Sequence, residues 1–183
     1  MPTADETPAP PHRALTAVEG ARVLDAPAAA LVRPLRGAAA SVPGRLLRGR
    51  WLGHPLHPLA VTVPIGAWVC SALFDLVPGQ EDAARRLVGT GLLAAPAAVL
   101  LGLFDYADLD ERQRRVGLAH AAGNAVAIAL FGASYAARSR GRVARGRVLG
   151  ALGLAVTSAG GALGGHLAYA QGAGFFRWQG GAR

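Results

Sequence analysis

The sequence predicts an all-α protein, a four-helix transmembrane bundle that follows a basic, partly disordered N-terminal tail. Two observations carry this prediction. Hydrophobic residues make up 52% of the 183 residues and the mean hydropathy is +0.31, which is high for a soluble protein. Four apolar blocks, each near the length of a membrane span, are joined by short connections, and short connections make adjacent helices antiparallel.

The first apolar block, Leu59–Val77, carries a single charged residue, Asp75, close to its end. Its length and composition are those of a membrane-spanning helix. The block follows the segment HPLHP, in which His54 and His57 each precede a proline. Proline disfavours the α conformation in the residue before it, so we expect an extended lead-in segment here.

The other three blocks are Leu87–Phe104, Val116–Ala137 and Val148–Ala170. The second block contains no charge and holds Pro96 in its middle, where we expect a kink. None of the four blocks shows a polar face, which weighs against the alternative of a soluble helical bundle. The predicted organisation is therefore a tail over 1–50, a transmembrane domain over 51–174 and a C-terminal tail over 175–183.

The N-terminal tail is expected to be disordered over 1–12, which is rich in proline and acidic residues. Between 13 and 49, arginines and leucines recur together, and prolines divide the chain into pieces that we expect to be too short for stable soluble helices. This pattern favours short basic amphipathic segments on a membrane surface. A simple flexible tether is the alternative.

The formal net charge is +8, and all 19 basic residues are arginines. These arginines gather at the ends of the apolar blocks, where anionic headgroups attract them, so the expected partner is a lipid bilayer and not a nucleic acid. The single cysteine, Cys70, lies in the first block, so no disulfide can form within one chain. The N-terminus lacks the pattern of a signal peptide, so we expect the tail to stay in the cytoplasm of a bacterium, with the spans in its inner membrane.

Histidines gather on one face of the predicted membrane domain. We call the face that carries the N-terminal tail side A and the opposite face side B. The alternation of the spans places His54 and His57 at side A, and places His120 and His166 about one turn below it. Asp105 closes the second span on this side, and the other polar residues expected in the layer are Asn124 and Tyr169. Ionisable groups in a membrane protein usually face the bundle interior or a cavity.

This layer is a candidate cofactor site. His54, His57, His120 and His166 would supply the three or four nitrogen ligands of a transition metal if HPLHP folds over the bundle. Haem b needs only two facing imidazoles, for which His120 and His166 are candidates. Asp105 is a candidate partner that would fix one imidazole tautomer. Each histidine also has a structural explanation, at the headgroups or in a helix pair, and the layer without a ligand would be able to pass protons.

The fourth block contains two G-x-x-x-G pairs, formed by Gly160 with Gly164 and by Gly161 with Gly165. This spacing lets helix backbones approach closely in lipid. Close helix packing is the simpler explanation, and space for a flat cofactor beside His166 is the functional one. The sequence contains no nucleophile–base triad, phosphate-binding loop or dinucleotide loop, so we name no catalytic residue and do not expect an enzyme acting alone.

Four stretches of the sequence resemble a bacterial membrane domain family, the domain of unknown function 2231. These stretches are WLGHPLHP with PIGAW and FDL, then GLFDYAD, then RRVGLAHAAGN, and finally LGGHLAYAQGAG. The resemblance covers 51–174. It implies a four-span protein, and a redox setting, because some members carry a Rieske iron–sulfur domain after the membrane part. This sequence has no Cys-His pairs for such a cluster, so an iron–sulfur or cytochrome partner would be a separate chain.

The first functional hypothesis is therefore electron transfer through haem b or a metal bound at side A. The alternatives are a non-redox membrane scaffold or assembly subunit, with the histidines at an interface, and a small transporter or proton conductor.

Overall fold

The computed structural model describes residues 9–174, which form helices and turns and contain no strand. The N-terminal part forms α1, a short 3-10 turn η1, α2 and α3. The spans are built from α4 with α5, from α6, from α7, and from α8 with the π-helical segment η2. The bounds are α1 Pro10–Gly20, η1 Arg22–Leu24, α2 Asp25–Ala40, α3 Val42–Leu47, α4 His57–Ala60, α5 Thr62–Phe74, α6 Glu81–Tyr106, α7 Glu111–Ser139, α8 Val143–Gly165 and η2 His166–Ala170.

The described part of the chain holds four helices long and apolar enough to cross a membrane, which confirms the predicted fold class. The helices extend beyond the predicted apolar blocks because their charged first turns are also helical. In α6 the first turn carries Glu81 and Asp82, and acidic groups are favourable at a helix N-terminus. In α7 a capping box joins Asp110 and Gln113, with hydrogen bonds of 2.9 and 3.1 Å.

The lead-in to the first span differs from the prediction. His57 is not extended but is the first residue of α4, and Pro58 lies in the same first helical turn. The first turn of a helix tolerates proline because its missing N–H would have no partner inside the helix. The consequence is that the His57 side chain is placed by a helix.

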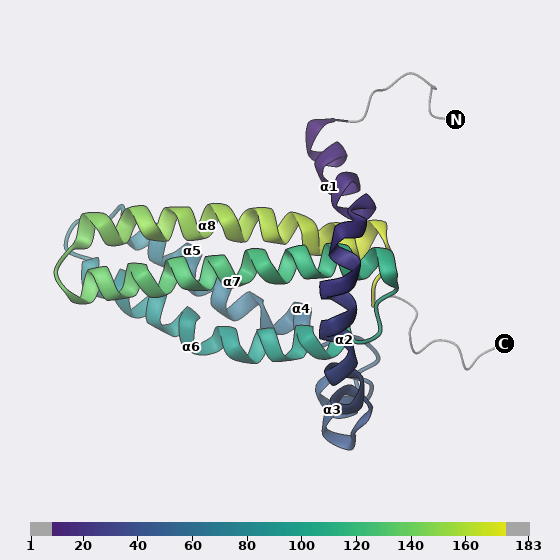
Figure 1. The fold of residues 1–183 in the computed structure, drawn as a ribbon. Helices are drawn as coiled ribbons and strands as arrows, with labels where there is room; N and C mark the ends of the chain where they lie inside the picture. The colour runs from purple at the N-terminus through teal and green to yellow at the C-terminus, as the bar shows by residue number, and fades with distance from the viewer. Residues whose placement is uncertain (1–8, 175–183) are drawn as a thin grey trace, which may run out of the picture.

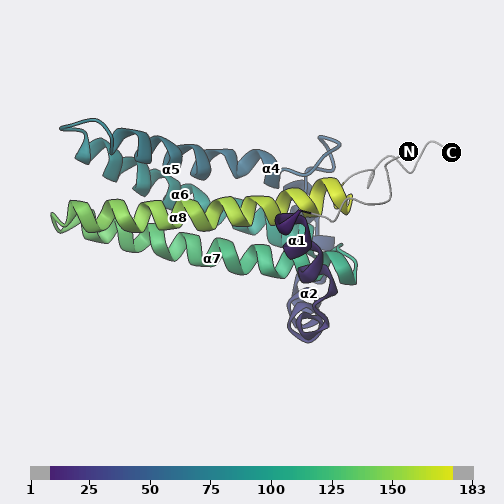
Figure 2. The same ribbon diagram turned by 90° about the horizontal axis from the view of Figure 1, so that it is seen from above.

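The spans form two antiparallel hairpins (Figure 1). In one, α5 turns into α6, and in the other α7 turns into α8; the turns use Gly79 and Gly141 with positive φ angles of 77° and 72°. Each hairpin packs more closely within itself than against the other, and Figure 2 shows α4 and α5 set apart from α7. Both hairpin turns lie at one end of the bundle, and the N-terminal helices lie at the other.

The centre of the bundle is an apolar cluster of Trp68, Val88, Ala95 and Phe131, all buried. The rings of Trp68 and Phe131 stack with centroids 4.0 Å apart and an interplanar angle of 12°. Large apolar side chains such as Leu93, which is 84% exposed, point outward. Such an exposed apolar surface fits a lipid environment.

Glycines let α7 and α8 pack side by side. A Cβ at Gly160 would lie 3.0 Å from Asn124 Oδ1, and a Cβ at Gly164 would lie 3.0 Å from a ring carbon of His120. The glycine pair predicted for close packing therefore does pack closely. The space beside Gly160 and Gly164 is filled by side chains of α7, which contradicts the idea that these glycines make room for a flat cofactor. Gly161 has no neighbour at that distance.

The N-terminal part contains longer helices than expected. α2 runs over 16 residues with Pro34 inside it, so the expectation that prolines break this part into short pieces is wrong there. α2 buries Ala28, Val32 and Ala39, and Val32 joins Tyr106 of α6 in an apolar cluster. Packing against other helices stabilises a helix that its own propensity would not. α2 runs across the spans at one end of the bundle (Figure 1). Residues 10–12, which were expected to be disordered, belong to α1, while residues 1–8 lie outside the described part.

Candidate functional site

His57 and His120 form a polar pair between the two hairpins. His57 begins α4 in the first hairpin, and His120 lies in α7 of the second. Their ring centroids are 6.3 Å apart, with the ring planes perpendicular, and both side chains are half-buried. The pair therefore bridges the two hairpins at the end of the bundle near α2.

Backbone carbonyls set the orientation of both imidazoles. Nδ1 of His57 lies 2.9 Å from the carbonyl oxygen of Ala98 in α6, and Nδ1 of His120 lies 2.7 Å from that of Gly160 in α8. A carbonyl oxygen only accepts, so each Nδ1 carries the proton and donates it. Each Nε2 is left as the acceptor in a neutral ring. Asn124 Nδ2 donates to Nε2 of His120 over 2.9 Å.

The other residues predicted for the layer lie elsewhere. His54 is exposed, and its Nδ1 bonds the carbonyl oxygen of Pro55. His166, at the start of η2, is hydrogen-bonded through Nε2 to Glu19 of α1. Tyr169 is 84% exposed. Asp105 is half-buried in the last turn of α6.

The predicted four-histidine metal site is not formed. Within residues 9–174, which include His54, His57, His120 and His166, no three or more His, Cys, Asp or Glu side chains could hold a metal ion together. There are two reasons. HPLHP does not fold over the bundle, because His57 is part of α4. His166 is hydrogen-bonded to Glu19 of the N-terminal helix α1. The partner of His120 in a ring contact is His57 and not the predicted His166.

Glu19 anchors the N-terminal helices to the spans. Its carboxylate accepts hydrogen bonds from Arg112 of α7, at 2.5 Å, and from His166. Burial alone would raise the pKa of the Glu19 carboxyl, but hydrogen bonds from Arg112, His166 and Gln171, together with the positive charge of Arg112, outweigh it and lower this pKa below 4.5. Glu19 is therefore a buried carboxylate stabilised in its ionised form.

Two further ion pairs attach the N-terminal part. Arg115 donates to both carboxylate oxygens of Asp25 at 2.5 and 3.0 Å, and also to the carbonyl of Glu19 at 2.8 Å. The Arg115 hydrogen bond lowers the pKa of Asp25 despite some desolvation. Arg48 pairs with Asp108 after α6. The described part of the tail is thus held to the spans and their connections at Glu19, Asp25 and Arg48, although contact with a membrane surface stays a prediction.

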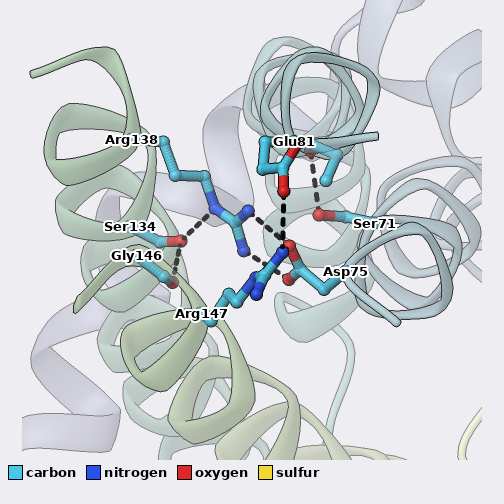
Figure 3. A network of polar contacts seen from close by, with 8 residues as sticks. Ser71, Asp75, Glu81, Ser134, Arg138, Gly146 and Arg147 are labelled. Carbon is cyan, nitrogen blue, oxygen red and sulfur yellow. Dashed lines mark hydrogen bonds and ion pairs between the residues drawn. The ribbon is translucent and has the colours of Figure 1, made fainter. Parts of the chain in front are cut away.

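A second polar network lies at the opposite end of the bundle, side B (Figure 3). Asp75, at the end of α5, accepts two hydrogen bonds from Arg138 of α7, at 2.7 and 2.6 Å. Arg147 of α8 lies 3.3 Å from both Asp75 and Glu81. Arg138 also donates to Ser134 Oγ at 3.2 Å. This network joins all four spans at their side B ends.

These ion pairs were not predicted, although the sequence contains one signal for them. Asp75 is the only charge in an apolar span, and such a charge needs a partner. Arg138 was counted among arginines attracted to headgroups, whereas its side chain is only 2% exposed. No comparable signal pointed to Glu19, because its partners depend on how the tail docks.

These features define a class: an all-α membrane protein with four candidate spans and a helical N-terminal part packed across one end. The sequence comparison defines the family. The profile of a family described as "Predicted membrane protein (DUF2231)" matches residues 53–176. The chain therefore belongs to this family, as its motifs predicted. Comparisons with curated proteins and with solved structures gave no match.

Proposed function

We propose that the chain is a membrane electron-transfer protein in which His57 and His120 hold the iron of haem b between the two hairpins. One observation carries this proposal. Both imidazoles donate Nδ1–H to a backbone carbonyl, and a histidine that binds a metal typically donates its other ring N–H to such a group. Each ring is therefore held in the tautomer that offers Nε2 as the ligand atom.

The spacing of the rings supports the same proposal. Two imidazoles that share one metal, each bonded at about 2.0–2.1 Å, place their ring centres roughly 6 Å apart, and His57 and His120 lie at 6.3 Å. Two imidazoles suffice for haem, so the proposal does not need the four-histidine set. The iron would supply one-electron chemistry. The chain would supply both ligands, and Asn124 would have to give up its hydrogen bond to His120.

The place of this site in the cell is part of the proposal. We propose that side A faces the cytoplasm of a bacterium and that the spans lie in its inner membrane. The electron-transfer partner would be a separate iron–sulfur or cytochrome protein. The second candidate function is a non-redox scaffold or assembly subunit. It is favoured by the ion pairs at both ends of the bundle and by the hydrogen bond through which Asn124 occupies Nε2 of His120.

A proton or solute path through the bundle is less well supported. The two polar centres lie at opposite ends of the spans, and the stacked rings of Trp68 and Phe131 lie in the apolar cluster between them. An apolar core offers no groups to relay a proton. Electron transfer at one face needs no such path.

The test is the visible absorption of the full-length protein purified from cells supplied with iron and a haem precursor. We expect a Soret band that shifts on reduction with dithionite, and its loss in His57→Ala and in His120→Ala. The matched control is His54→Ala, which removes an exposed histidine outside the pair. His166→Ala should also keep the band, because His166 bonds Glu19. A colourless, metal-free protein from such cells would contradict the proposal and favour the scaffold.

A further inference from the structure

A second candidate site lies outside the histidine pair, in a hollow of about 490 Å³ under α2. Its volume is within the range of roughly 300–1,000 Å³ that ligand pockets occupy. The hollow lies between α2, the end of α3 and the turn from α6 to α7. Its lining combines three arginines, one aspartate and small apolar residues: Arg36, Ala39, Ala40, Arg48, Ala107, Asp108 and Arg114.

The charges around the hollow do not balance. Arg48 pairs with Asp108, which leaves the positive charges of Arg36 and Arg114 on the same hollow. Nε of Arg114 is buried and has no hydrogen-bond partner among the described residues. A buried donor without a partner costs free energy. An anion with several acceptor oxygens would offset the repulsion between the Arg36 and Arg114 guanidinium groups that line the hollow.

The chemistry of the lining selects the kind of anion. Guanidinium groups bind phosphate oxygens through paired, charge-assisted hydrogen bonds. Because α2 crosses the spans at one end of the bundle (Figure 1), the hollow lies at the end of the spans, where a membrane protein meets lipid headgroups. Arginines at a membrane surface attract anionic lipids.

We propose that this hollow binds one phosphate group, supplied by the headgroup of an anionic phospholipid. The bound phosphate lies against Arg36 and Arg114, and it joins α2 to the start of α7. This site is independent of the histidine pair, since neither His57 nor His120 lines it.

The test uses the full-length protein in detergent, with native mass spectrometry after addition of phosphatidylglycerol or of zwitterionic phosphatidylcholine. We expect one phosphatidylglycerol to be retained in preference to phosphatidylcholine. Affinity should fall at least about tenfold in Arg36→Gln/Arg114→Gln, given the strength of hydrogen bonds to charged groups. The control is Arg33→Gln, an exposed arginine of the same helix that does not line the hollow.

A second arm separates a lipid from free phosphate, by comparing thermal stability in inorganic phosphate and in chloride at equal ionic strength. One outcome is that phosphate stabilises the unmodified protein but not the double variant, while neither protein retains the lipid. That result would assign the site to free phosphate and would support a phosphate site in this hollow. If the double variant folds poorly, Arg36→Gln alone replaces it, since Arg36 is exposed. The proposal would be overturned if that variant binds lipid and phosphate as well as Arg33→Gln and the unmodified protein do.

Discussion

The Asp75–Arg138 pair predicts a large loss of stability when one partner is removed. Arg138 is 2% exposed in its side chain and Asp75 12%, so water screens this pair very little. The substitution Asp75→Asn removes the charge that balances Arg138 and weakens the acceptor for two hydrogen bonds, at 2.7 and 2.6 Å. Breaking a buried pair by removing one partner costs about 3–5 kcal/mol. Ser134 accepts a hydrogen bond from Arg138 but is neutral, so it does not compensate.

The assay is equilibrium unfolding of the purified protein from mild detergent into increasing SDS, followed by circular dichroism. The matched control is Asp82→Asn in the first turn of α6, whose side chain is 58% exposed and pairs with Arg85 and Arg86. Exposed ion pairs and exposed acidic groups in a first helical turn contribute far less than a buried pair does, so we expect this control to lose far less stability than Asp75→Asn. If Asp75→Asn unfolds like the unmodified protein, the pair is screened and the reasoning is refuted.

A double substitution separates the charge from the packing. Asp75→Leu with Arg138→Met removes both charges while keeping most of the volume. Replacing a buried ion pair by apolar residues is often neutral or stabilising, so the double variant should recover most of the stability that Asp75→Asn loses. A double variant no more stable than Asp75→Asn would instead mean that hydrogen bonding within the network, and not charge balance, holds this end of the bundle together.

Two further predictions concern the N-terminal anchor and the glycine packing. Because the folded-state pKa of Glu19 is lowered, its contribution to stability is full above its usual pKa of 4.5 and is lost as pH falls below that value through the folded pKa; proteolysis of α1 should therefore accelerate below pH 4.5, and Glu19→Gln should weaken that dependence, leaving the part that Asp25 contributes. In Gly91→Ala, the added Cβ would lie 2.6 Å from Cδ1 of Trp68, which is buried and cannot yield, so we expect a loss of about 1–3 kcal/mol in SDS unfolding. Gly132→Ala, with no atom within 4 Å of its Cβ, is the control and should not destabilise.

The spans were predictable because each rests on information within one short stretch of sequence. A block such as Leu87–Phe104 must be helical in lipid, since its backbone has no other partners there. The short connections then fixed which residues share a face of the membrane. His57 and His120 were both placed at side A in this way, and the structure brings them together.

The choice of partners within that layer was not predictable. His120 has neighbours on several helices, and the depth and rotation of each helix decide which of them it meets. A shift of one helical turn, about 5.4 Å, would separate it from His57. His166 was expected to face His120, but it lies at the start of η2, where Glu19 binds it. Glu19 belongs to a tail whose docking depends on tertiary contacts and not on its own pattern.

The distribution of charge explains why the histidine pair is the better functional candidate. The described ion pairs of the spans lie at their ends, where each charge has a partner and the role of each pair in holding helices together is clear. The imidazoles of His57 and His120 also join helices, since His57 bonds a carbonyl of α6 and His120 bonds a carbonyl of α8. Unlike the ion pairs, each imidazole leaves Nε2 as an acceptor that its Nδ1–carbonyl contact does not use, and this is the feature that favours a ligand role. Asn124 holds Nε2 of His120 in the absence of a ligand, so removing its amide in Asn124→Ala should strengthen binding if the pair is a site, and should only destabilise the bundle if it is not.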